Sequence, residues 1–184
     1  MIRILLFISL FFFPNKSNAL IEVDITRGNL NPLPIAVSPL SIDDNSKKNF
    51  EKILKKKNIG SEIAIVVENN LKASGLFNPL NRDAFLQAPD IANLKPRFED
   101  WNLIKAQALI TGKVNFINDK LRVEFRLWDV LAGKEMMALA FTTVPSNWRR
   151  VGHIITDKVY ERLTGEKGYF DTRIIYVSLS LIHI

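Results

Sequence analysis

Cysteine is absent from the 184 residues of this chain. Disulfide bonds, thiolate metal sites and cysteine nucleophiles are therefore excluded. Histidine is scarce as well, since only His153 and His183 occur. Neither has a set of His, Asp or Glu residues at the helical spacing that a metal site needs. Asp157 lies one turn from His153 but supplies only a single carboxylate. We interpret His153 as a partly exposed helical side chain.

Catalytic motifs are also lacking. No G-x-S-x-G nucleophile elbow is present. The stretch Ile110–Val114, ITGKV, contains Gly-Lys but lacks the upstream glycine of a phosphate loop and lies in a strand-like run. Glu22 and Asp24 share one face of a strand pattern, which is more typical of a solvent face that discourages aggregation. The sequence therefore predicts neither an enzyme nor a cofactor.

Long hydrophobic runs are missing too. The longest, Ile4–Phe13, is about half of the roughly 20 residues that a transmembrane helix needs. Arg3 precedes it, and the small residues Ser17 and Ala19 follow at the positions that signal peptidase reads. We predict a signal peptide over residues 1–19, cut between Ala19 and Leu20, rather than a membrane anchor. The mature chain should contain no integral membrane segment.

The positive charge is modest once this segment is removed. The whole chain has 25 basic and 19 acidic residues, a net charge of +6. Loss of residues 1–19 removes Arg3 and Lys16 and no acid, which leaves a charge of +4. Export to a compartment without nucleic acid weakens a nucleic-acid function further. We therefore expect no nucleic-acid partner.

The first part of the mature sequence predicts strands and helices in alternation. Apolar residues alternate with polar ones from Leu20 to Arg27, which is strand periodicity. Helical periodicity appears later, with Gly75 where a left-handed C-terminal residue belongs. We expect strands at 20–27, 34–40 and 77–80, a helix at 61–74 buried through Ile63, Val66, Val67 and Leu71, and a shorter helix at 96–105 with Phe98, Trp101, Leu103 and Ile104 as apolar contacts.

The lysine-rich stretch Asp43–Asn58 has two interpretations. Phe50, Ile53 and Leu54 form a thin apolar stripe at helical spacing beside six lysines. One interpretation is a basic amphipathic helix for anionic surfaces. We prefer a solvated loop or the first turns of a helix, because the stripe is short.

The second half predicts a meander followed by a long helix. Strands are expected at 108–117, 121–130 and 135–144, with turns at Asn118-Asp119 and at 131–133. Pro145-Ser146 should open a helix that Gly165 ends, with Ser146 or Asn147 as its cap. Its buried stripe is expected at Val151, Ile155, Val159 and Leu163. The fold class is therefore α/β, one domain with a mixed β-sheet and helices packed on it.

Several motifs together resemble one family. They are IEVDITRG and PIAVSPL near the mature start, LKASGLFNPLNR at 71–82, ALITGKV at 108–114, the stretch 148–165, and FDTRIIYVS at 170–178. In this order they resemble the TolB family, the periplasmic components of the Tol–Pal envelope system. The resemblance implies an N-terminal α/β domain over residues 20–167 and a β-propeller whose first strand lies in residues 168–178.

The resemblance also implies non-enzymatic protein binding in the periplasm, serving envelope integrity and cell division. Members of the family bind the lipoprotein Pal and bacteriocins mainly through the propeller. They bind TolA through the N-terminal segment. In this sequence the TolA-binding residues would be Leu20, Ile21, Glu22, Val23, Asp24, Ile25, Thr26 and Arg27.

The last six residues, LSLIHI at 179–184, depart from the family pattern. They resemble the translation of a transposase adapter used in sequencing libraries. A propeller needs about 4–8 blades, so we expect an incomplete reading frame that ends in adapter sequence. A natural truncation with an unrelated tail is the alternative.

A different function class stays open at this point. Tryptophans can stack on sugars or bases, and Trp101, Trp128 and Trp148 lie in three different predicted elements. We interpret them as core or interface residues. The alternative is an exported small-ligand- or carbohydrate-binding domain that uses Trp101 or Trp148, which would require a concave, largely apolar pocket.

Overall fold

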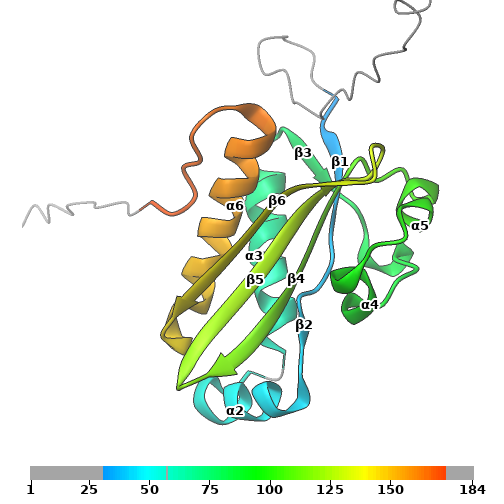
Figure 1. Ribbon diagram of the computed structural model, residues 1–184. Coiled ribbons are helices and arrows are strands. Elements are labelled where there is room, and N and C mark those ends of the chain that lie inside the picture. Colours follow the sequence, from blue (N-terminus) through cyan, green and yellow to red (C-terminus); the bar gives the residue numbers. More distant parts are fainter. Residues whose placement is uncertain (1–30, 57, 173–184) are drawn as a thin grey trace, which may run out of the picture.

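The chain folds around a six-stranded mixed β-sheet (Figure 1). The computed structural model describes residues 31–56 and 58–172. The strands are β1 (Leu33–Val37), β2 (Ser41–Ile42), β3 (Phe77–Pro79), β4 (Ala108–Ile117), β5 (Lys120–Asp129) and β6 (Lys134–Thr143). The sheet order is β3-β1-β4-β5-β6, with β2 pairing beside β4. The predicted mixed sheet is therefore confirmed.

Strand direction divides the sheet into two halves. β1 pairs in parallel with both β3 and β4, and β2 pairs in parallel with β4. β4, β5 and β6 form the predicted antiparallel meander. The β4–β5 turn has positive φ at both Asn118 and Asp119, 50° and 59°, as expected for a two-residue hairpin turn of mirror-image type.

Helices pack on both faces of the sheet. They are α2 (Asp44–Leu54), α3 (Ile59–Ala73), α4 (Pro89–Leu94), α5 (Phe98–Leu103) and α6 (Trp148–Thr164), with single 3₁₀ turns η2 (Arg82–Ala84) and η3 (Pro145–Asn147). Figure 1 shows α3 and α6 lying together behind the meander, while α4 and α5 lie to one side, beyond β4. Among the described residues, no helix is both long and apolar enough to span a bilayer.

The larger core lies between the sheet and the helices α2, α3 and α6. Both predicted helical stripes are confirmed, because the eight residues named for them are all buried. The two long helices approach closely at Gly152, where a Cβ atom would lie 2.8 Å from Val66 Cγ1. Gly165 ends α6 with a φ of 75°, as predicted. Neither predicted cap holds a side-chain bond to the helix: Ser146 lies within η3, and Asn147 donates to Thr143 Oγ1 instead.

A smaller core covers the opposite face of the central strands. Ala36 of β1 and Leu109 of β4 point into it, and Trp101 of α5 fills it at 1% exposure. The prediction that Leu103 makes an apolar contact is wrong, since this residue is 74% exposed. The helix α5 ends at Leu103, and Ile104 packs against the smaller core instead.

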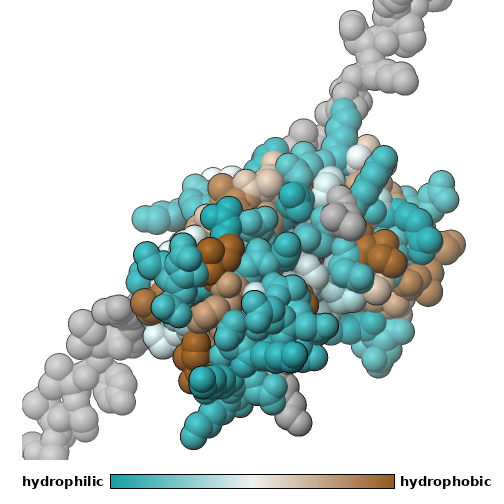
Figure 2. All heavy atoms as spheres, turned by 60° about the horizontal axis from the view of Figure 1, so that its bottom comes forward, coloured by the Kyte–Doolittle hydropathy of each residue, from teal (hydrophilic) through white to brown (hydrophobic). Residues whose placement is uncertain are grey.

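Of the two forms preferred for residues 43–58, the solvated loop is wrong and the helical turns are borne out as a longer, packed helix. Asp44–Leu54 form the three-turn helix α2, capped by the Asp43 carboxylate, which accepts from the Ser46 amide at 2.9 Å. Phe50 is fully buried and meets Phe116 edge-on at 5.3 Å between ring centroids. Lys47, Lys48, Lys52 and Lys55 face solvent. Figure 2 shows a largely hydrophilic surface with small hydrophobic areas on the side that includes α2.

Candidate protein-interaction surfaces

The predicted TolA-binding residues, Leu20–Arg27, and the predicted cleavage site between Ala19 and Leu20 lie outside the described residues. The structure does describe where the N-terminal segment joins the domain. β1 begins at Leu33 in the interior of the sheet, and the Leu33 amide donates to the Leu76 carbonyl at 2.9 Å. The segment thus enters the fold at a strand that is held on both sides.

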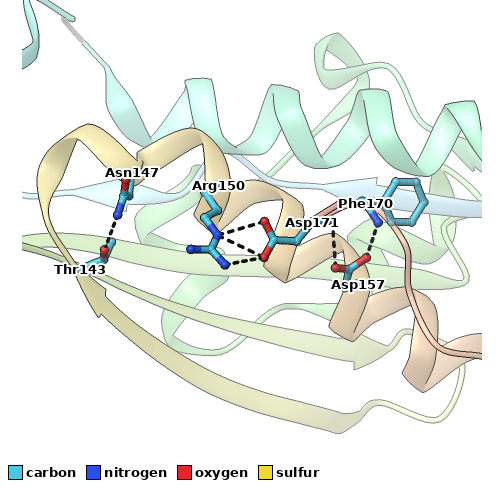
Figure 3. A network of polar contacts seen from close by, with 6 residues as sticks. All are labelled: Thr143, Asn147, Arg150, Asp157, Phe170 and Asp171. Carbon is cyan, nitrogen blue, oxygen red and sulfur yellow. Dashed lines mark hydrogen bonds and ion pairs between the residues drawn. The ribbon is translucent and has the colours of Figure 1, made fainter. Parts of the chain in front are cut away.

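The other end of the described chain forms a strap along α6. We call Glu166–Thr172 the C-terminal strap. The amides of Phe170 and Asp171 donate to the two carboxylate oxygens of Asp157, at 2.7 and 3.1 Å. Gly168 lies so close to Asp157 that a Cβ atom would be 2.4 Å from the Asp157 Cα. The strap is therefore bound to the helix through its backbone, as Figure 3 shows.

A charged contact holds the strap nearer the start of α6. The Arg150 guanidinium donates to the Asp171 carboxylate with Nε at 3.0 and 3.1 Å and Nη2 at 3.0 Å (Figure 3). The hydrogen bond and charge of Asp171 raise the pKa of Arg150. This bidentate contact fixes the orientation of the Asp171 carboxylate better than a single lysine contact would. Because Arg150 is solvent-exposed, this ion pair adds little to stability, and its main effect is to hold Asp171 in place.

The two ends of the sheet differ as strand edges. β3 has three residues and ends in Pro79, which cannot donate to another strand. β6 has ten residues, carries no charge from Met136 to Thr143, and among the described residues pairs only with β5. Leu139 is 38% exposed on this edge strand. A long uncharged edge of this kind is a template for pairing with another strand.

A hollow of about 230 Å³ lies where β6 ends and α6 begins. It is lined by Phe141, Thr142, Thr143, Asn147, Arg150, Val151 and Ile154. Three of the lining side chains, Phe141, Val151 and Ile154, are apolar, and the others carry polar groups. Arg150 both lines this hollow and contacts the strap.

The outward face of β5 and β6 carries two ion pairs beside the small apolar residues Ala138 and Ala140. Arg122 and Glu124 of β5 pair at 2.8 Å, and Arg126 pairs with Glu135 of β6 at 3.3 Å. Since these charges neutralise one another and are half exposed, this face offers no concentrated charge to a ligand.

The family motif at 71–82 ends in a clamp between a loop and α3. Arg82 donates through Nε to Glu68 at 2.6 Å and through Nη1 to Ser61 at 3.1 Å. Burial raises the pKa of Glu68, and the bond and charge of Arg82 oppose that shift. The clamp holds the loop after β3 against the helix, so this arginine has a structural role.

The tryptophans proposed for ligand stacking do not form a site. Trp101 is 1% exposed, and Trp148 is 9% exposed beneath Lys56 and Arg149. Trp128 donates to Thr111 Oγ1 at 2.9 Å. The indole rings thus pack inside the domain, which agrees with the interpretation preferred from the sequence. Neither Trp101 nor Trp148 is exposed enough to stack on a ligand, so the alternative of a small-ligand- or carbohydrate-binding domain has no support from these residues.

His153 behaves as a packed helical side chain. Its Nδ1 lies 2.9 Å from the Asn70 amide nitrogen, and it is half-buried between α6 and α3. Within residues 31–56 and 58–172, no group of three histidine or carboxylate side chains is placed to bind a metal ion. His183 lies outside this range. The strap, the β6 edge and the hollow could be found only from the fold, because no local pattern shows that the chain turns back along α6 or which strand ends the sheet.

The described residues define an open-sheet α/β domain with a long edge strand, β6, and a C-terminal strap fastened to α6. The chain belongs to the TolB amino-terminal domain family, whose sequence model matches residues 21–136. It is 83% identical over 173 residues to the Tol-Pal system protein TolB of Pelagibacter ubique (strain HTCC1062). That match covers 94% of this chain and 39% of the relative, so the chain spans well under half of the relative's length.

A solved structure supports the same fold. The crystal structure of TolB from Acinetobacter baumannii superposes with a TM-score of 0.59 at 21% identity. The match covers 81% of this chain and 32% of that one. At 21% identity, this similarity shows only that the sheet and helices are arranged in the same way.

Proposed function

We propose that this chain provides the N-terminal α/β domain of a periplasmic component of the Tol–Pal system and that it acts by binding proteins rather than by catalysis. The observation that carries this proposal is the 83% identity to a Tol-Pal system TolB along 94% of the chain. In this proposal residues 1–19 direct export, residues 20–167 form the domain, and residues 168–178 lead into a propeller.

The first partner is TolA, bound through Leu20–Arg27. Support comes from the way this segment joins the domain. β1 is held between β3 and β4, so its pairing does not depend on what the preceding residues contact. Five residues, 28–32, separate the segment from β1, and they include Gly28 and Pro32. A partner can therefore engage the segment while the sheet remains intact.

The mode of binding is strand addition to an edge of the TolA fold. Main-chain hydrogen bonds would contribute affinity, and alternate side chains would contribute specificity. Ile21, Val23 and Ile25 lie on one face of the alternating pattern, so they are the side chains that would enter the partner's apolar surface.

The second partner is Pal, bound through the propeller. The 184-residue sequence contains at most the first strand of such a propeller, since a propeller needs about 4–8 blades. A chain that starts at Leu20 should accordingly bind TolA through residues 20–27 but have little affinity for Pal by itself.

Two matched triple variants test the TolA proposal. The first replaces Ile21, Val23 and Ile25 by serine, and the second replaces Glu22, Asp24 and Thr26 by serine. Strand addition predicts that the first abolishes binding to purified TolA and that the second retains most of it, while circular dichroism shows both folded. Equal losses, or no loss in either variant, would show that the alternating face is not the contact.

A further inference from the structure

The edge strand β6 closes one side of the sheet, in front of α6 (Figure 1). Within the described residues its outer side has no strand partner. The free stretch is limited at both ends. Met136 is an extra residue, a bulge, in the pairing with β5, and its carbonyl accepts from Arg162 Nε at 3.3 Å. Pro145 follows the strand and has no N–H to donate. Another strand can therefore add along Met137–Thr143.

The two faces of this stretch differ in the size of their side chains. Alternate side chains point to the helix side, because they lie opposite three β5 residues that are buried in the larger core. They are Met137, Leu139 and Phe141. Leu139 is 38% exposed, so the edge leaves part of this apolar face uncovered. The outward face carries the small residues Ala138 and Ala140, which leave room for the backbone of an added strand.

The charge pattern favours an uncharged strand as the occupant of this edge. Met137–Thr143 contains no charged residue, so two copies of it can pair without placing like charges opposite each other. A highly charged strand would instead bring unpaired charges against the apolar face. Arg150, which lies beside Thr143 in the hollow at the end of β6, is already paired with Asp171. The edge is therefore complementary to itself.

We propose that two copies of this chain pair through β6 in antiparallel fashion, about a two-fold axis at Ala140. Self-pairing over the whole of Met137–Thr143 places the middle residue opposite itself. Leu139 of each copy then lies opposite Phe141 of the other. Phe141 lines the hollow of about 230 Å³, and a cavity of about 150 Å³ can hold a benzene ring. The exposed leucine of each copy thus fills the hollow of the other.

Sedimentation velocity of the full chain over a range of concentrations tests for the dimer. Each copy contributes one short strand, and interfaces below about 1,200 Å² are typically weak, so the dimer should dissociate on dilution. Leu139→Lys would bury an unpaired charge against the other copy, so it should leave only monomer. Leu131→Lys is the matched control, because Leu131 is 67% exposed in the turn before β6 and should leave the dimer intact.

Single cysteine variants locate the axis, because the natural sequence has no cysteine to interfere. Directly opposite residues in an antiparallel pair have Cα atoms about 4.5–5.5 Å apart, within the disulfide range of about 4.4–6.8 Å. Ala140→Cys should therefore form disulfide-linked dimers under mild oxidation. Ala138→Cys is the control, since it is exposed on the same face but its two copies would lie about 13 Å apart along the strands. On non-reducing electrophoresis it should cross-link at least about tenfold more slowly.

Each other outcome would overturn the proposal. A chain that stays monomeric at every concentration would exclude the dimer, and equal effects of the two lysine substitutions would show that β6 is not the contact. Equal cross-linking of the two cysteine variants would indicate random collision, and faster cross-linking of Ala138→Cys would contradict an axis at Ala140. Circular dichroism checks that each variant is folded. Because no substitution alters residues 20–27, failure here would leave the TolA proposal to its own test.

Discussion

The burial of Phe50 predicts that α2 is an integral part of the domain rather than a charged attachment. Phe50 is fully buried and packs edge-on against Phe116 of β4. Replacing a buried phenylalanine by alanine costs about 3–5 kcal/mol, from lost apolar burial and from the cavity left behind. For a domain of this size each kcal/mol lowers the melting temperature by roughly 2–4 °C. We therefore expect Phe50→Ala to lower it by roughly 6–20 °C.

Ile53→Ala is the matched control, because Ile53 lies on the same helix but is 51% exposed. Its cost should be within about 0.5 kcal/mol, as for most surface substitutions. Thermal unfolding followed by circular dichroism, with urea unfolding as a check, measures both variants. If the two variants shift the melting temperature equally, Phe50 does not anchor α2 and the reasoning fails.

Three more predictions concern the fold, its pH dependence and export. Val66→Asp places an unpaired charge between α3 and α6, so it should abolish cooperative unfolding or cost several kcal/mol in urea titrations. Hydrogen bonds from Ser46 lower the pKa of Asp43 below its ordinary value of 3.8; the stabilisation is therefore full above pH 3.8 and is lost as the pH falls through the lower folded pKa. Asp43→Ala should cost about 1 kcal/mol at pH 7, with a difference from the natural chain that shrinks below pH 3.8. Ala19→Arg should leave uncleaved precursor in cell fractions, whereas natural chains that still begin at Met1 after export would contradict cleavage.

Elements with strong periodicity could be predicted from the sequence. The stripe of α6 repeats every three or four residues over four turns, so its buried face was evident before its partners were known. The Asn118-Asp119 turn was predicted because these residue types tolerate positive φ, which the hairpin needs. The family motifs supplied the domain type.

Other elements depend on contacts that no local pattern reveals. α2 is polar over most of its length, and Phe50 is the main side chain that it buries in the core. The short apolar stripe in the sequence therefore gives little indication that the helix is packed. α4 was missed because its six residues, beginning with Pro89, are too few to display a helical period. The strap and the hollow lie between segments that follow one another in the chain, but the turn of the strap back onto α6 depends on contacts to Asp157 and Arg150 that no sequence pattern reveals. Their proximity follows only from the fold.

Titration calorimetry of the chain against purified TolA and purified Pal tests the central proposal most directly. The chain beginning at Leu20 should bind TolA with measurable heat and bind Pal at least about a hundredfold more weakly, a difference of about 2.7 kcal/mol. Removing residues 20–31, which precede β1, should abolish TolA binding and leave the circular dichroism spectrum of the domain unchanged. Tight Pal binding by this chain, or TolA binding that survives the deletion, would contradict the proposed division of contacts.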